Sequence, residues 1–345
     1  MPDHIEFRTK PQIALDLIDR ALANGIRVKA WTFDEFYGRD GSFLDALEQR
    51  KQMFVAEVPS NFYGWVLKPQ VLEDGPSPRR GRKKTYPRLA RRRPASTVRN
   101  LFIYSPKFRQ QKWQRYRVKD TDRGPEVWEV KWAVFWRKGA DGLPGRRHCL
   151  IVTRNVLTGE VKYFVSNRVP GDRGVTLRWL LRVAFGRWSV ESCFRQAKEE
   201  LGLDHYEVRG WRCVHRHFYL TQLSHLFCAR IRQKFDAAAT QEDPIEEIAT
   251  EHRRVGGHKP EAGKKDIRER LTTEQVRRAV NVWLSTLALR FTVTQHLQRE
   301  LDRQRYYQRR NAQARKSHTK TRIAKLKSRG IDPDRIKTCI SPPPT

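Results

Sequence analysis

The sequence has few hydrophobic residues and no long hydrophobic run. Of its 345 residues 38% are hydrophobic, and the most apolar stretches, such as WLSTLALRF (283–291), are short and interrupted by Arg or Ser. A membrane-spanning helix needs about 20 consecutive apolar residues. The charged start MPDHIEFRTK also lacks the basic region and apolar stretch of a secretory signal. We therefore expect neither a membrane span nor export, and we expect the chain to stay in the cytoplasm.

Cysteine is also scarce, and no two cysteines form a CxxC pair. An odd number at scattered positions favours reduced thiols over a disulfide framework, so each is expected to be a small packed residue. Four histidines and two cysteines gather between residues 205 and 228 without the paired spacing of a zinc finger, which favours packing and hydrogen bonding. The cysteines are Cys149, Cys193, Cys213, Cys228 and Cys339.

Acidic residues are outnumbered by basic ones. There are 38 Asp and Glu against 70 Lys and Arg, which gives a formal net charge of +32. Residues 1–60 are slightly acidic, whereas residues 61–190 hold 30 basic and 9 acidic residues. Such an excess repels itself unless a polyanion neutralises it, so nucleic acid is the expected partner. A generic basic protein without a specific partner is the alternative.

The densest basic segment is RRGRKKTYPRLARRR (79–93), with nine basic residues in fifteen and no acid. It cannot pack as a core and is typical of an exposed arm that contacts phosphate, or of a solvated loop that orders only on binding. Its candidate DNA-binding residues are Arg79, Arg80, Arg82, Lys83, Lys84, Arg91, Arg92 and Arg93.

The first 60 residues predict an α/β unit. The spacing of apolar residues predicts a helix over about 12–23 and a buried strand over 26–33, with Asp34 at the end of that strand. A second helix is expected to start near Ser42, before a short strand at 53–58. Parallel strands need a crossover helix, so this order favours a parallel pair.

Residues 60–175 predict a β-rich basic insertion. The segments 128–138 and 148–167 are strand-like, and the second is expected to be a hairpin that turns near Gly159. Aromatic residues alternate with basic ones there, which is compatible with base stacking beside phosphate contacts. Packing of the aromatic residues inside a small sheet is the favoured interpretation.

The remaining chain predicts helices. A helix over 176–202 is expected to begin at Thr176, to end at Gly202 and to be broken near Gly186, and a second helix is expected over 217–235. A polar linker over about 236–269 and a third helix should follow. The basic tail (296–330) is expected to form a helix that lies along phosphate, or to be solvated. The apolar stripe of the first helix would comprise Trp188, Phe194, Ala197 and Leu201.

One carboxylate and two cations share a face of the helix over 176–202. At about 100° per residue, Arg187, Glu191 and Lys198 project in nearly one direction. Alone this pattern is weak, because Arg and Glu four residues apart form an ordinary surface pair.

Two longer blocks strengthen the pattern. WTFDEFYGRDGSFLDALEQRKQMFVAEVP (31–59) and FGRWSVESCFRQAKEELGLDHYEVRGWRCVHRHFYLTQLSH (185–225) resemble blocks of bacterial insertion-sequence transposases of the DDE type that carry a Tyr-Arg-Glu-Lys signature. The resemblance implies a ribonuclease H-like α/β domain in which Asp34 and Glu191 bind metal and act in catalysis, while Arg187 and Lys198 contact DNA phosphates. Ala184 stands where the signature has its Tyr, with Phe185 beside it.

The resemblance also implies a function and a domain division. Two Mg²⁺ or Mn²⁺ ions would support hydrolysis of double-stranded DNA at transposon ends and strand transfer, with the protein bound to DNA as a homodimer. Residues 1–59 and 176–235 would form the ribonuclease H-like domain, 60–175 the insertion, and 236–345 a linker, helix and basic tail.

The family's first metal-binding Asp has no counterpart in this sequence. Asp16 and Asp19 lie on the helix expected over 12–23 rather than after a strand, and Glu35 is expected to point away from Asp34 across an extended backbone. The expectation is therefore a copy that starts late and that binds DNA but cuts poorly, since a metal pair lacking one of three carboxylates is loosely placed. A catalytically inactive DNA-binding remnant that regulates a complete transposase is the alternative, and an RNA-binding protein is a third.

Overall fold

The computed structural model describes residues 6–73, 86–90, 93–121, 123–241, 273–288 and 293–339. The chain divides into two compact units, with boundaries between Trp188 and Ser189 and between Ala312 and Gln313. The first unit holds the sheet and the C-terminal segment, and the second holds helices. Within the described ranges, no helix is long and apolar enough to cross a membrane.

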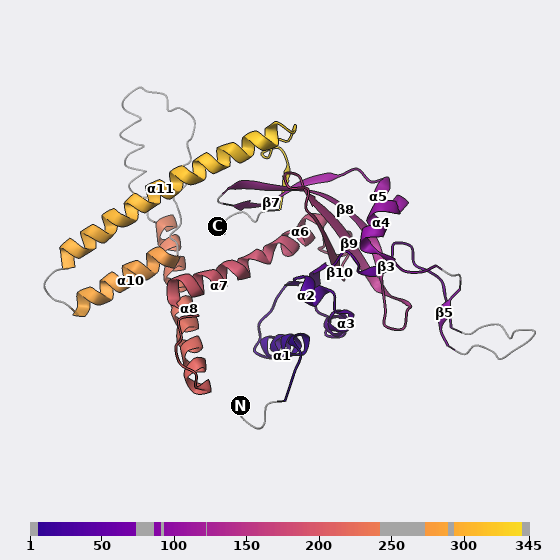
Figure 1. Ribbon diagram of the computed structural model, residues 1–345, viewed down its shortest axis with the longest axis horizontal. Coiled ribbons are helices and arrows are strands. Elements are labelled where there is room, and N and C mark those ends of the chain that lie inside the picture. Colours follow the sequence, from indigo (N-terminus) through magenta and orange to yellow (C-terminus); the bar gives the residue numbers. More distant parts are fainter. Residues whose placement is uncertain are drawn as a thin grey trace, which may run out of the picture. The chain divides into compact units, whose positions relative to one another are not determined.

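A mixed sheet of nine strands organises the first unit (Figure 1). Its main path runs β1-β2-β10-β9-β8-β3-β6, and β7 and β11 extend it from β8. β1 is parallel to β2 and β11 to β7, while the other pairs are antiparallel. The strands are β1 (Trp31–Phe33), β2 (Phe54–Val58), β3 (Tyr63–Trp65), β6 (Ser96–Thr97), β7 (Gln114–Thr121), β8 (Gly124–Lys138), β9 (Pro144–Asn155), β10 (Val161–Ser166) and β11 (Lys337–Thr338).

The N-terminal α/β segment, residues 6–60, follows the sequence expectation with one correction. α1 (Lys10–Ala23), α2 (Glu35–Gly38) and α3 (Gly41–Gln49) flank the parallel pair of β1 and β2. The buried strand expected over 26–33 is wrong in length, because only Trp31–Phe33 finds a pairing partner in β2. The apolar residues before it, Ile26 and Val28, are exposed.

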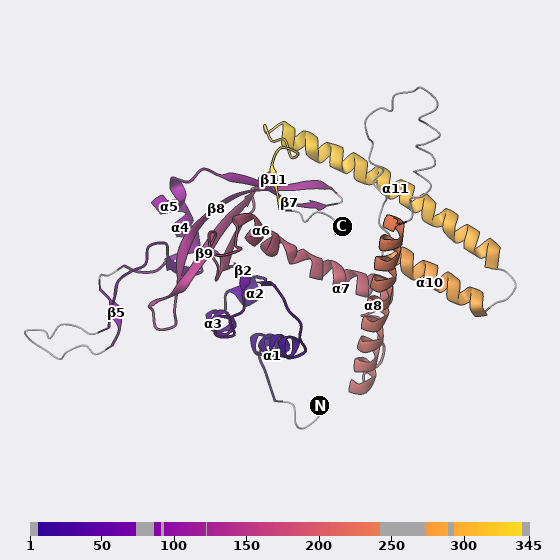
Figure 2. The ribbon, with the colours of Figure 1, turned by 180° about the vertical axis from the view of Figure 1, so that it is seen from behind.

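Two hydrophobic cores lie on opposite faces of the sheet. α1, α3, α4 (Val98–Tyr104) and α5 (Pro106–Arg109) cover one face with Ile18, Phe43, Val98 and Phe108 among their buried residues. α6 (Leu177–Gly186) covers the other face with Leu180 and its neighbours. Figures 1 and 2 show α1 and α3 along one side of the strands and α6 along the other. Full burial of an apolar side chain contributes about 1.5–3 kcal/mol, so these faces supply most of the stabilisation.

α2 approaches β2 so closely that only glycine fits at its end. A Cβ atom on Gly38 would lie 1.9 Å from the carbonyl oxygen of Glu57 and 3.3 Å from the Cβ of Ala56. The backbone contact therefore fixes α2 against the sheet, and with it the residue that begins α2.

The segment expected as an insertion shares the sheet of the segment before it. β10 pairs with β2 in an antiparallel register, so residues 60–175 continue the sheet that begins at β1. The hairpin of β9 and β10 turns where expected, with Gly159 at φ 75°. In the basic segment, β5 (Arg88–Leu89) pairs with β4 (Val71–Leu72) in a separate two-stranded ribbon.

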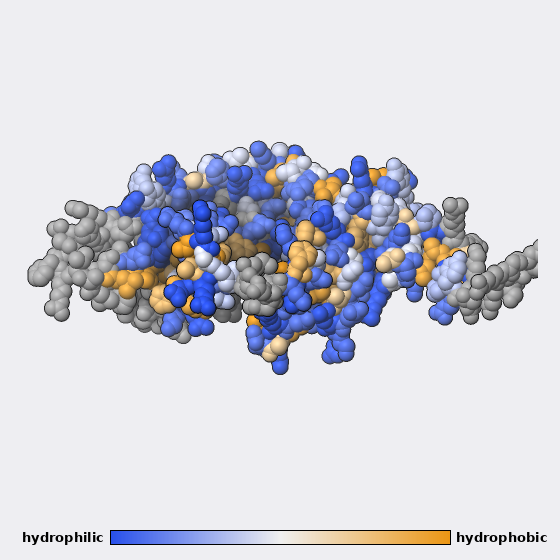
Figure 3. All heavy atoms as spheres, turned by 60° about the horizontal axis from the view of Figure 1, so that its bottom comes forward, coloured by the Kyte–Doolittle hydropathy of each residue, from blue (hydrophilic) through white to orange (hydrophobic). Residues whose placement is uncertain are grey.

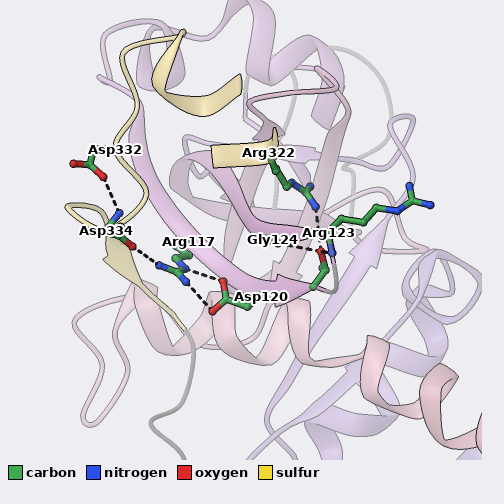
Figure 4. Close-up of polar contacts among 8 residues, drawn as sticks. Arg117, Asp120, Arg123, Gly124, Arg322, Asp332 and Asp334 are labelled. Carbon is green, nitrogen blue, oxygen red and sulfur yellow. Dashed lines mark hydrogen bonds and ion pairs between the residues drawn. The ribbon is translucent and has the colours of Figure 1, made fainter. Parts of the chain in front are cut away.

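The C-terminal segment is attached to the sheet rather than solvated. β11 pairs with β7, and the amide of Cys339 donates to the Arg117 carbonyl at 2.8 Å. Figure 4 shows the Arg117 guanidinium between Asp120, at 2.8 Å, and Asp334, at 3.0 Å. Gly124, at φ 102°, lets the helix before this segment approach, because a Cβ there would lie 3.2 Å from the Cα of Thr319. The expectation that the tail is solvated is therefore wrong for its last part, whereas its contact with phosphate stays a prediction.

The second unit is helical. Its α7 (Trp188–Leu201), α8 (Trp211–Gln241), α10 (Thr273–Ala288) and the first part of α11 (Val293–Lys327) agree with the expected helices, although α8 is longer than the 217–235 predicted. The linker expected over 236–269 begins inside α8, and its residues from 242 lie outside the described ranges. Arg277 of α10 bonds to Glu200 of α7 at 3.3 Å.

Many apolar side chains of α8 are exposed. Tyr219, Leu223 and Phe227 are each more than half exposed. On the face that Figure 3 shows, hydrophobic patches lie between the hydrophilic residues that dominate the described surface. The expected apolar stripe of α7 is also wrong at Phe194, which is 53% exposed, whereas Ala197 is buried.

Candidate active site

Asp34 lies at the C-terminal end of β1, as expected, and begins α2. It is the N-cap of that helix, and its Oδ1 accepts a hydrogen bond from the Tyr37 amide at 3.3 Å. An N-cap carboxylate stabilises the start of a helix, so Asp34 has a structural role whether or not it binds metal. Its side chain is half-buried. The backbone contact of Gly38 with β2 holds this short helix, and therefore Asp34, against the sheet.

A polar cleft of about 630 Å³ opens beside α2. Glu35 of α2 and Arg39, which follows that helix, line it with Asp45 of α3 and Arg137 of β8. Glu35 is the first residue of α2, so the expectation that it continues an extended backbone is wrong. Arg137 is 5% exposed and forms an ion pair with Asp45. These charged residues carry no signal in the sequence, because they come from three separate elements.

The second set of candidates lies on α7. Glu191 is in the first turn of this helix and Lys198 in its last turn, and both are exposed. Arg187 stands between α6 and α7 with helical dihedral angles, φ −54° and ψ −34°. Arg187 therefore precedes α7, and the expectation that it shares a face with Glu191 and Lys198 stays a prediction. A structural interpretation is also available, since acids near the start and bases near the end of a helix interact favourably with its dipole.

Asp34 and Glu191 lie in different units, so their meeting at one site stays a prediction. Carboxylate oxygens are the ligands that Mg²⁺ prefers, and both residues suit it chemically. Across the described part of the chain, no three His, Cys, Asp or Glu side chains gather in a way that would hold a metal ion. Asp34 and Glu191 are candidates for metal binding on the sequence pattern alone.

Ala184, which stands where the Tyr-Arg-Glu-Lys signature has its tyrosine, lies in the core. Ala184 is 5% exposed, and the ring of Phe185 packs on Trp128 and Phe164 with centroids at 5.0 and 5.5 Å. Phe185 therefore serves packing at this position.

The basic arm is described only in part, since seven of its eight candidate residues lie outside the described ranges. The eighth, Arg93, is exposed, and its carbonyl accepts a hydrogen bond from the Trp65 indole.

A buried pair of polar side chains supports α3 behind the cleft. Glu48 of α3 approaches Nε2 of His148 at 2.6 Å, and Nδ1 of His148 donates to the Arg146 carbonyl at 2.8 Å. His148 is 0% exposed and Glu48 is 7% exposed. Burial raises the pKa of Glu48, but the His148 hydrogen bond and the charges of His148, Arg137 and Arg146 outweigh it and leave this pKa below its usual 4.5.

This pair predicts a loss of stability in acid. A carboxylate whose pKa is lowered by folding contributes stability above its unfolded pKa of 4.5, and the contribution disappears as the pH falls through the lower folded value. The urea midpoint should therefore fall below about pH 4.5, more steeply in the wild type than in Glu48→Gln. Equal acid slopes for the two proteins, measured by urea unfolding between pH 3 and pH 7, would contradict the prediction.

The comparisons with known proteins address the N-terminal part of the chain. The search of curated proteins found no match to the chain. A family model described as DDE superfamily endonuclease matches residues 1–125, which include Asp34 but not Glu191. The first 125 of the 345 residues are therefore similar to endonucleases of the DDE superfamily, which supports a relationship to DDE transposases.

Proposed function

We propose that this protein is a DDE-type transposase of an insertion sequence that cleaves double-stranded DNA in a reaction that depends on Mg²⁺ or Mn²⁺. The family match over residues 1–125 carries this proposal. The position of Asp34 at the end of a strand in a mixed α/β sheet supports it, because carboxylates at strand ends are placed by the sheet rather than by a loop.

The roles of the side chains follow from their chemistry. Asp34 and Glu191 would hold the metal through carboxylate oxygens, and Arg187 and Lys198 would contact the phosphates on either side. A divalent metal, when bound, supplies positive charge at the scissile phosphate and lowers the pKa of a bound water. The net charge of +32 supports a polyanionic substrate. Transposon ends as substrate, a homodimer on DNA and a ribonuclease H-like domain belong to the same proposal.

An assay with supercoiled plasmid tests this function. We expect slow nicking with Mg²⁺ or Mn²⁺ and none with EDTA, because two carboxylates place the metal less firmly than three. Binding of the same plasmid without nicking in any divalent metal would refute the enzyme and favour the DNA-binding remnant. Mobility shift and nicking should be measured on the same samples, so that a failure to bind is separated from a failure to cut.

A further inference from the structure

A second basic site lies on the first unit and contains none of the residues assigned to cleavage. A cavity of about 470 Å³ opens between the turn after β9 and the residues that follow α11. Three arginines and one glutamate line it, and we call these residues the arginine trough: Arg115, Glu129, Arg154 and Arg329. Arg115, Glu129 and Arg154 come from β7, β8 and β9, and Arg329 follows α11.

Glu129 fixes two of the arginines in place. It is 9% exposed, and its Oε1 accepts from Nε of Arg115 at 3.3 Å. Its Oε2 accepts from Arg154 through Nη2 at 2.6 Å and through Nε at 3.2 Å. The Arg154 guanidinium also lies 4.5 Å from the centre of the Trp113 ring. Arginine side chains that are already ordered lose less entropy when they bind a ligand.

The C-terminal segment brings the third arginine. Nη1 of Arg329 donates to the Val156 carbonyl in the turn after β9. Leu326 and Ile331, on either side of Arg329, are buried against Val127 of β8. The turn itself is braced by Asn155, whose Oδ1 accepts from two backbone amides at 2.9 and 3.0 Å.

The positive charge of the arginine trough exceeds the negative charge of Glu129, the acid among its residues. The lining holds one carboxylate and three guanidinium groups, and the nearby Lys131, whose Nζ lies 4.8 Å from the centre of the Trp113 ring, adds a further cation. Burial and the charge of Arg154 lower the pKa of Lys131, although Glu129 opposes this. Among the described residues that line the cavity, Glu129 is the only acid. Holding like charges together is unfavourable unless an anion compensates them.

We propose that the arginine trough binds a phosphate group of the DNA backbone. The inference rests on the proposed function, which supplies the DNA. The planar fork of arginine matches phosphate oxygens in a bidentate way. Arg115 bonds to Glu129 through Nε and Arg329 bonds to the Val156 carbonyl through Nη1, which leaves further nitrogens of both forks to donate to a phosphate. The trough would hold DNA through residues other than those of the cleavage site and so fix the position of the duplex.

Substitution in the trough should weaken DNA binding and its dependence on salt. We expect Arg329→Gln and Arg154→Gln each to weaken binding of a labelled duplex about 3- to 10-fold, and to reduce the slope of log K against log salt by about 0.9 for each phosphate that is no longer neutralised. Arg20→Gln, which removes an exposed charge from α1, is the matched control and should change binding by less than about 2-fold. Melting curves show whether each variant is folded, and Arg329→Gln leaves the bonds of Glu129 intact.

Binding is measured in EDTA, so that its result is independent of cleavage. A trough variant that matches Arg20→Gln in affinity and slope would refute the proposal even if the protein nicks plasmid. Conversely, a reduced slope in a protein that never nicks would support the trough and refute only the enzyme. If inorganic phosphate raises the melting temperature of the protein without competing with duplex, the trough binds free phosphate. If the trough variants lose binding to RNA but not to DNA, the trough binds RNA. Either result would overturn the proposal.

Discussion

Glu191→Ala is expected to reduce metal-dependent nicking to the background seen in EDTA. In the proposed function Glu191 is one of two carboxylates that hold the metal, and the loss of one leaves a single ligand on the protein. Misplacement of a reacting group by about 1 Å already costs about 100-fold in rate, so loss of a metal ligand should cost at least that much. The measurement is the initial rate of plasmid nicking at saturating Mg²⁺, with Mn²⁺ as a second metal.

Glu199→Ala is the matched control for this prediction. Glu199 lies on the same helix, is 57% exposed and pairs with Arg195 at 3.3 Å, so its removal deletes an equal charge and costs at most about 1 kcal/mol of stability. It should nick at the wild-type rate. Equal rates for Glu191→Ala and the wild type would show that α7 does not carry the metal ligand. Equal losses in both variants would show that the charge of α7, rather than one carboxylate, matters.

Local patterns were sufficient to predict the elements that carry the candidate site. Thr176 accepts from the Trp179 amide and begins α6, as its position before an apolar helix indicates. Phe43, Leu44 and Leu47 are buried on one face of α3, as their spacing predicts. Asp34 follows the last residue of β1 and is the N-cap of α2, a position that Asp favours. Each of these signals lies within a few residues of the element that it determines.

Contacts between distant parts of the chain could not be predicted in the same way. β10 joins β2 across more than 100 residues, and no local pattern in the sequence indicates that residues 60–175 continue the sheet that begins at β1. Arg115 and Arg329 line the same cavity, yet nothing near either residue marks its partner. Spacing alone predicts that Phe194 and Ala197 share an apolar stripe of α7, but of these two only Ala197 is buried. Spacing determines which residues share a face, not which face is covered.

His148→Ala is expected to lower the free energy of unfolding by about 3–5 kcal/mol, because it leaves the carboxylate of Glu48 buried without its closest partner. The pair joins α3 to the sheet, so its loss weakens the packing of α3. The first residue of α3, Gly41, lines the cleft beside α2. Urea unfolding at pH 7 measures the effect. For comparison, Asp16→Ala breaks an ion pair with Arg8 that is about half exposed and should cost at most about 1 kcal/mol.

Replacing both partners separates the ion pair from simple packing. The double variant Glu48→Leu/His148→Leu removes both buried polar side chains and fills much of their space, so it should recover most of the stability lost in His148→Ala. If the double variant is as unstable as His148→Ala, the shape of the site rather than the unpaired charge is responsible. If His148→Ala alone costs less than about 1 kcal/mol, Glu48 reaches solvent or Arg146 without cost, and the lowered pKa of Glu48 cannot arise from its hydrogen bond to His148.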